Sequence, residues 1–168
     1  WTHLRHGQNY MYRNDTPIEP EGHATDLFTR WSVDYVRSRA REEGPWFLYL
    51  AYNAPHTPVQ PPEEWIARVR NREPEISETR ARLVAFIEHL DHGIGAVLEA
   101  LRETGQDQNT LIVFTSDNGG HLPSEADNGP WRSGKQHLYE GGIRVPAAAV
   151  WEGKISPGRR SDLRLISM

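Results

Sequence analysis

The chain has 168 residues, of which 37% are apolar and 25% charged, a composition typical of one globular domain and not of a disordered chain. A formal net charge of -4 gives no electrostatic reason to expect a nucleic-acid partner, and no apolar run reaches the ~20 residues of a membrane span. Because the sequence contains no cysteine, it offers no disulfide, no thiolate metal site and no cysteine nucleophile. It begins at Trp1 without an initiator methionine or a signal peptide, so we expect a fragment or a processed product.

Helical and strand-like patterns alternate along the chain. Apolar residues at helical spacing predict three helices. The first begins at Thr25 and ends before Gly44–Pro45, the second is short and begins near Glu63, and the third covers about 77–104 with Gly105 as its C-cap. Short apolar runs typical of strands cover 46–52, 110–115 and 146–151. We expect the first run to be buried on both faces and the last to lie at a sheet edge. The alternation predicts an α/β layered fold with a mostly parallel sheet flanked by helices.

Two irregular loops, 53–62 and 117–142, follow the first two expected strands. Ligands of parallel sheets bind outside the carboxyl ends of the strands. The two loops are therefore predicted to face one pocket.

The stretch "TLIVFTSDNGGH", residues 110–121, places Asp117 and Asn118 side by side where the second expected strand ends. Carboxylate and amide oxygens are ligands that Ca²⁺ or Mg²⁺ prefers. An Asx-turn that simply ends the strand accounts for the same two residues. The dipeptide alone leaves both interpretations open.

Two further side chains in these loops suit chemistry on an anion. His56, in "NAPHTP", is an imidazole on a proline-bounded loop, where it is suited to proton transfer or to hydrogen bonding. Lys135, in "GPWRSGKQHLYEGG", is a cation on a glycine-framed loop. Taken singly, each also fits an ordinary exposed loop residue.

Other polar residues favour structural roles. Glu140 is expected to lie in a turn, where its carboxylate could also anchor Lys135. Trp131 is expected to pack against other side chains, with stacking on a sugar ring as the alternative. His89 and His92 are spaced three apart on the expected long helix, where a polar helix face is expected in preference to a metal pair.

Three segments resemble, in order and spacing, the central part of the type I sulfatases: "FLYLAYNAPHTPVQPPEEW", "HLDHGIGAVLEALRETGQDQNTLIVFTSDNGG" and "NGPWRSGKQHLYEGGIRVP". These enzymes are calcium- and formylglycine-dependent members of the alkaline-phosphatase-like superfamily. The resemblance implies an alkaline-phosphatase-like fold, incomplete at its N-terminus, in which residues 1–168 form the central part of a single catalytic domain. It implies Asp117 and Asn118 as Ca²⁺ ligands. It also implies that His56 contacts the sulfate and assists the leaving group, and that Lys135 binds the sulfate.

The sequence departs from the family pattern in one respect that matters for activity. It contains no Cys/Ser-x-Pro-x-Arg motif, whose first residue becomes the formylglycine nucleophile in the family. We expect that motif and the remaining calcium ligands upstream of Trp1. The isolated chain is therefore predicted to lack sulfatase turnover and to bind Ca²⁺ weakly, because two oxygen ligands are too few.

The expected substrate is a sulfated small molecule or carbohydrate, and export from the cytoplasm is suggested by the resemblance only. Two alternatives stay open. One is a phosphomonoester or phosphonate hydrolase of the same superfamily. The other is a non-catalytic module that lacks the nucleophile.

Overall fold

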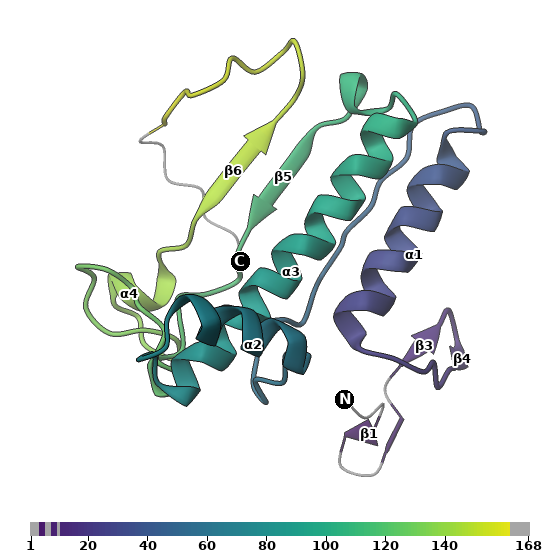
Figure 1. Ribbon diagram of the computed structural model, residues 1–168. Coiled ribbons are helices and arrows are strands. Elements are labelled where there is room, and N and C mark those ends of the chain that lie inside the picture. The colour runs from purple at the N-terminus through teal and green to yellow at the C-terminus, as the bar shows by residue number, and fades with distance from the viewer. Residues whose placement is uncertain (1–3, 6–7, 10, 162–168) are drawn as a thin grey trace.

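The computed structural model describes residues 4–5, 8–9 and 11–161 of the chain (Figure 1). The helices are α1 Ala24–Arg39, α2 Glu63–Arg72, α3 Glu78–Glu103 and the short α4 Glu140–Ile143, with single 3-10 turns at Asp107–Asn109 and Leu122–Ser124. The strands are β1 Leu4–Arg5, β2 Gln8–Asn9, β3 Tyr12–Arg13, β4 Thr16–Pro17, β5 Ile112–Thr115 and β6 Ala147–Val150. Among the described residues, none of these helices has the length and apolar character needed to cross a membrane.

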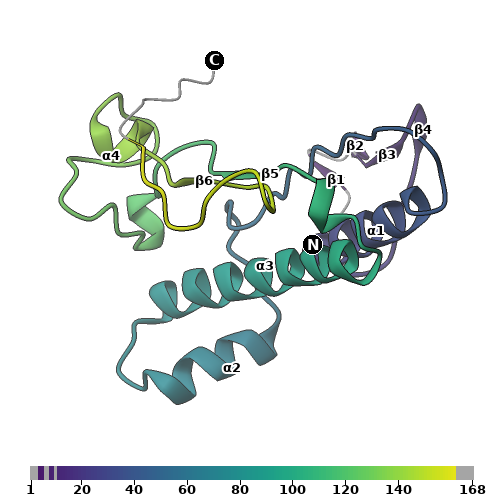
Figure 2. The same cartoon turned by 90° about the horizontal axis from the view of Figure 1, so that it is seen from above.

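Helices α1 and α2 both pack against helix α3. Figure 1 shows α1 beside it, running in the same direction, and the view from above in Figure 2 shows α2 along another side. One buried cluster joins α2 to the first half of α3 through Trp65, Ile66, Val69, Ala81 and Ala85. A second cluster joins α1 to the last turns of α3 through Val36, Val97, Ala100 and Leu101, and Ile112 of β5 packs against it. Burying a valine, leucine or isoleucine side chain stabilises the fold by about 1.5–3 kcal/mol, so these two clusters hold the helices together.

The ends of α3 follow from local signals. The Ser77 hydroxyl accepts the Arg80 backbone N–H at 3.1 Å and so caps the first turn. At the other end Gly105 has φ +68, and the N–H of Gln106 reaches back to the carbonyl of Leu101 at 2.9 Å. The expected helix over 77–104 and its glycine C-cap are both confirmed.

The sheet differs from the expected one. Strands β5 and β6 occupy the predicted runs, but they pair with each other in antiparallel fashion, with Ile112 opposite Val150 and Thr115 opposite Ala147. The other described pairs, β1 with β2 and β3 with β4, are also antiparallel. The α/β character is confirmed, and the parallel sheet is not.

The prediction of a strand buried on both faces at 46–52 is wrong for this structure. The segment forms no strand, and its side chains alternate: Trp46 and Leu50 pack against the α1–α3 cluster, whereas Phe47 and Tyr49 are 83% and 81% exposed. An apolar run indicates burial, but only pairing partners on both sides make such a run a central strand. Within the described residues this segment has no partner strand.

Candidate functional site

The loop after β5 begins with the predicted oxygen-donor pair. Asp117 is exposed and Asn118 half-buried. The Asn118 amide Nδ2 donates to the Gly119 carbonyl at 3.0 Å, and the Ser116 hydroxyl donates to the Asn118 carbonyl at 3.1 Å. Within the described part of the chain, neither the Asp117 carboxylate nor Asn118 Oδ1 makes a hydrogen bond. Both oxygen donors are therefore available to a ligand.

Glycines let the two ends of this loop approach closely. The Gly119 N–H donates to the Gly142 carbonyl at 2.9 Å. A Cβ on Gly119 would overlap the Gly141 carbonyl oxygen, and a Cβ on Gly134 would overlap the Gly120 carbonyl oxygen. Only glycine permits these backbone contacts, so the glycine-rich composition of 117–142 produces a folded-back loop.

Lys135 is placed by this folding. Its backbone N–H donates to the Gly120 carbonyl at 3.0 Å, which sets the half-buried lysine beside the segment that begins with Asp117 and Asn118. Within the described residues its ammonium group makes no ion pair. The structure thus brings together, through backbone contacts, two of the regions that the sequence singled out.

His56 lies apart from this loop in the recorded contacts. Its ring is exposed, its Nδ1–H donates to the Thr57 carbonyl at 2.6 Å, and its backbone N–H donates to Asn53 at 2.9 Å. Nδ1 is the donor in that bond, and among the described residues Nε2 has no hydrogen-bond partner, so Nε2 is the nitrogen available for proton transfer. No hydrogen bond joins His56 to residues 117–142 within the described chain.

Glu140 does not anchor Lys135. It accepts from Arg144 at 3.4 Å across the short helix α4. The Arg144 guanidinium also lies 4.1 Å from the centre of the Trp131 ring, whose side chain is 41% exposed. Glu140 therefore orders the end of the loop, and one face of Trp131 carries a cation.

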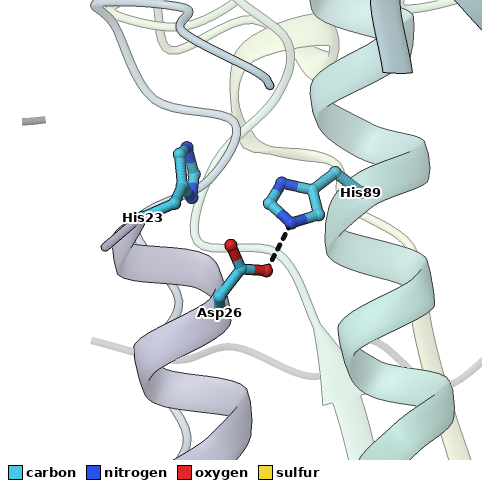
Figure 3. Close-up of side chains that lie close together, drawn as sticks. All are labelled: His23, Asp26 and His89. Atoms are coloured by element: carbon cyan, nitrogen blue, oxygen red, sulfur yellow. Dashed lines mark hydrogen bonds and ion pairs between the residues drawn. The ribbon is translucent and has the colours of Figure 1, made fainter. Parts of the chain in front are cut away.

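A second polar cluster joins α1 to α3 and was not expected (Figure 3). His89 is only 3% exposed, so the expectation of a polar helix face is wrong at this position. Its Nε2 lies 2.7 Å from Asp26 Oδ1, and its ring stacks on Trp65 at 5.5 Å. The spacing of His89 from Phe86 and Gly93, both buried on α3, was the available signal for its burial.

His23 completes this cluster at the N-cap of α1. Its Nδ1 accepts the Thr25 N–H at 3.1 Å, and its Nε2–H donates to the Gln60 carbonyl at 3.0 Å. Burial lowers the pKa of the His23 imidazole, although the bond to Gln60 opposes this. Ligand atoms of His23, Asp26 and His89 lie within 4.8 Å of one another, close enough to share a cation. Since both His23 nitrogens already have partners, the arrangement is a hydrogen-bonded contact between helices.

The comparisons with known proteins agree on one family. The family model described as Sulfatase matches residues 1–167. N-acetylgalactosamine-6-sulfatase of Mus musculus is 34% identical over 145 residues, covering 84% of this chain and 26% of that protein. A sulfatase of Formosa agariphila is 32% identical over 163 residues, covering 92% of this chain and 29% of that protein.

Solved structures give the same answer. The crystal structure of Ps i-CgsB in complex with k-i-k-neocarrahexaose superposes with a TM-score of 0.77 and 40% sequence identity, covering 82% of this chain and 30% of that one. The chain thus spans between a quarter and a third of the length of these relatives. By its sequence and its fold, the chain belongs to the sulfatase family.

Proposed function

We propose that residues 1–168 form the central part of a single sulfatase catalytic domain, which hydrolyses sulfuric esters. The observation that carries the proposal is the bond from the Lys135 backbone N–H to the Gly120 carbonyl at 3.0 Å. It holds a cationic residue next to the segment that presents the free oxygens of Asp117 and Asn118. Membership of the family supports the same reaction class.

The donor set at the end of β5 fits a hard divalent cation. One carboxylate and one amide oxygen are available there, and Ca²⁺ accepts mixed oxygen ligands of this kind. We assign Asp117 and Asn118 to such a Ca²⁺ site, with further oxygen ligands from outside this chain. When bound, the cation supplies polarisation of the sulfate oxygens.

Lys135 and His56 supply the other groups that this reaction requires. Cleavage of a sulfate ester moves negative charge onto the bridging oxygen, so a nearby ammonium group and a proton donor stabilise the transition state. A charge pair about 4 Å apart attracts by about 4 kcal/mol at an effective dielectric of about 20, before desolvation is subtracted. We assign Lys135 to binding of the sulfate and His56 Nε2 to protonation of the leaving oxygen.

The nucleophile is expected outside this chain, as a formylglycine. The sequence has no cysteine and no Ser-x-Pro-x-Arg motif. The exposed apolar side chains of Phe47 and Tyr49 fit a surface that further chain covers in the complete domain. The 168-residue piece by itself is therefore expected to be inactive.

The proposed substrate is a sulfated carbohydrate. The relatives named above include an N-acetylgalactosamine-6-sulfatase and a protein solved with a neocarrahexaose. Trp131, with one face free of the Arg144 guanidinium, offers an aromatic surface in the loop that carries Lys135.

The test is a hydrolysis assay on the full-length protein with its formylglycine in place, using 4-nitrophenyl sulfate and a sulfated galactosamine oligosaccharide. Asp117→Ala is expected to raise the Ca²⁺ concentration that gives half-maximal activity. Lys135→Ala is expected to lower kcat/KM by about 100-fold or more. Matched controls are Asp107→Ala and Lys154→Ala, at residues outside the loop.

Two other outcomes would contradict the proposed sulfatase activity. Turnover of 4-nitrophenyl phosphate in place of the sulfate would favour the phosphohydrolase alternative. Full-length protein that carries the nucleophile motif and hydrolyses neither ester would contradict a catalytic role.

A further inference from the structure

Asn128 connects the two arms of the folded loop. Its Oδ1 accepts the Gly120 N–H at 2.7 Å. Its Nδ2 donates to the carbonyls of Gly120 at 3.2 Å and of Ser133 at 3.1 Å. One half-buried amide therefore satisfies backbone groups on both arms, two residues after Asn118 and two residues before Lys135.

The amide is closely packed between these arms. A Cβ on Gly120 would lie 2.6 Å from the Ala126 Cβ and 3.0 Å from Asn128 Oδ1. A Cβ on Gly134 would lie 2.8 Å from Asn128 Nδ2. The position therefore leaves little freedom to the Asn128 side chain. The Gly120 carbonyl accepts from both Asn128 and the Lys135 backbone, so a shift of the amide moves the same carbonyl that holds Lys135.

We propose that Asn128 is a positioning residue, which fixes Lys135 relative to Asp117 and Asn118. The proposal rests on the function proposed above. Asn128 touches neither the ester nor the cation in this assignment and acts through the backbone of Gly120 and Ser133. A displacement of about 1 Å in a reacting group lowers rates by about 100-fold, so an amide that sets this spacing affects turnover without contacting the substrate.

The variant Asn128→Asp isolates the two donated bonds. It preserves the shape of the side chain and the acceptor for the Gly120 N–H, but it replaces the donor with a carboxylate oxygen facing two carbonyls. The control is the neighbouring residue: Asp127 is exposed, and its Oδ1 accepts the Gly129 N–H at 2.7 Å. Asp127→Asn keeps that acceptor and should leave activity unchanged.

The measurement is a double-mutant cycle on full-length protein, with 4-nitrophenyl sulfate as the probe. We expect Asn128→Asp to lower kcat/KM by about 10- to 100-fold. We expect Asn128→Asp in a Lys135→Ala background to cause little further loss, because the amide acts through that lysine. A merely structural amide would instead give losses that multiply in the double variant. If Asn128→Asp loses its native near-ultraviolet circular dichroism, Asn128→Ser, which adds no charge, takes its place in the cycle.

The outcomes separate the two proposals. An active wild type whose Asn128→Asp variant retains kcat/KM within about twofold overturns the role of Asn128 and leaves the sulfatase function standing. Losses that multiply in the double variant overturn it as well. An inactive wild type overturns the proposed function and, with it, this assignment.

Discussion

His89 Nε2 lies 2.7 Å from Asp26 Oδ1, joining the middle of α3 to the first turn of α1. The His89 ring is buried, and among the described residues its Nδ1 has no hydrogen-bond partner, so within that part of the chain only the bond to Asp26 compensates the buried imidazole. Asp26 also lies where the dipole of α1 favours a negative charge. The contact therefore links the capping of one helix to the packing of another.

Neutralising Asp26 should loosen this contact. Asp26→Asn is expected to lower the free energy of unfolding by about 1 kcal/mol, less than the roughly 1.5–3 kcal/mol of a hydrogen bond to a charged group, because the Asp26 side chain is 63% exposed. Urea denaturation measures this change in the free energy of unfolding. Asp34→Asn, at an exposed position of the same helix, is the control. Equal stabilities of the two variants would mean that the bond contributes nothing.

Stability should depend on pH through His23. Burial lowers its pKa below the usual value of 6.5, so the unfolded chain binds more protons between that lowered pKa and 6.5. The contribution of His23 is therefore fully present above pH 6.5 and is lost as the pH falls through the lowered pKa. Protonation would also remove the acceptor for the Thr25 N–H.

The check is unfolding free energy measured across this pH range. His23→Asn keeps an N-cap acceptor but does not titrate, so its stability should fall less steeply on acidification. His137→Asn, at an exposed histidine, should retain the wild-type slope. A wild-type slope in His23→Asn would assign the pH dependence to another group.

Two glycines of α3 should respond to alanine in opposite directions. A Cβ on Gly95 meets nothing within 4 Å, so Gly95→Ala should stabilise the chain by about 0.5–1 kcal/mol through helix propensity. A Cβ on Gly93 would lie 2.5 Å from Thr29 Oγ1, which is hydrogen-bonded to the Tyr52 hydroxyl at 2.7 Å. Gly93→Ala should therefore destabilise by about 1–3 kcal/mol. Thermal unfolding of the pair tests this, and shifts of the same sign would contradict the packing of α1 on α3.

The role proposed for His56 predicts a dependence on the leaving group. A sugar hydroxyl needs a proton as it departs, whereas 4-nitrophenolate does not, so His56→Gln should lower kcat by about 100-fold or more on the sugar sulfate and far less on 4-nitrophenyl sulfate. His137→Gln serves as the control at an exposed histidine. Equal losses on both substrates would remove His56 from the proton-transfer step.

The helices were predictable because their signals are local. The apolar spacing lies within α3 and Gly105 lies just beyond its end, and both were found where the sequence indicated. The run 46–52 carried a weaker signal. Its composition indicates an apolar environment, but partner strands decide whether one face or both are buried, and the exposed Phe47 and Tyr49 mark the face without a partner.

In the candidate site, too, some features follow from local sequence and others from tertiary contacts. The sequence alone determined that Asp117 and Asn118 are adjacent at the end of a strand, because neighbours in the chain stay neighbours in space. Only the tertiary structure decided that the Lys135 backbone meets Gly120, two residues after Asn118, because that contact depends on glycine packing and on the amide of Asn128, which close the loop between residues distant in sequence. It likewise decided that His89 is buried, since a polar side chain enters a core only where a partner such as Asp26 compensates it.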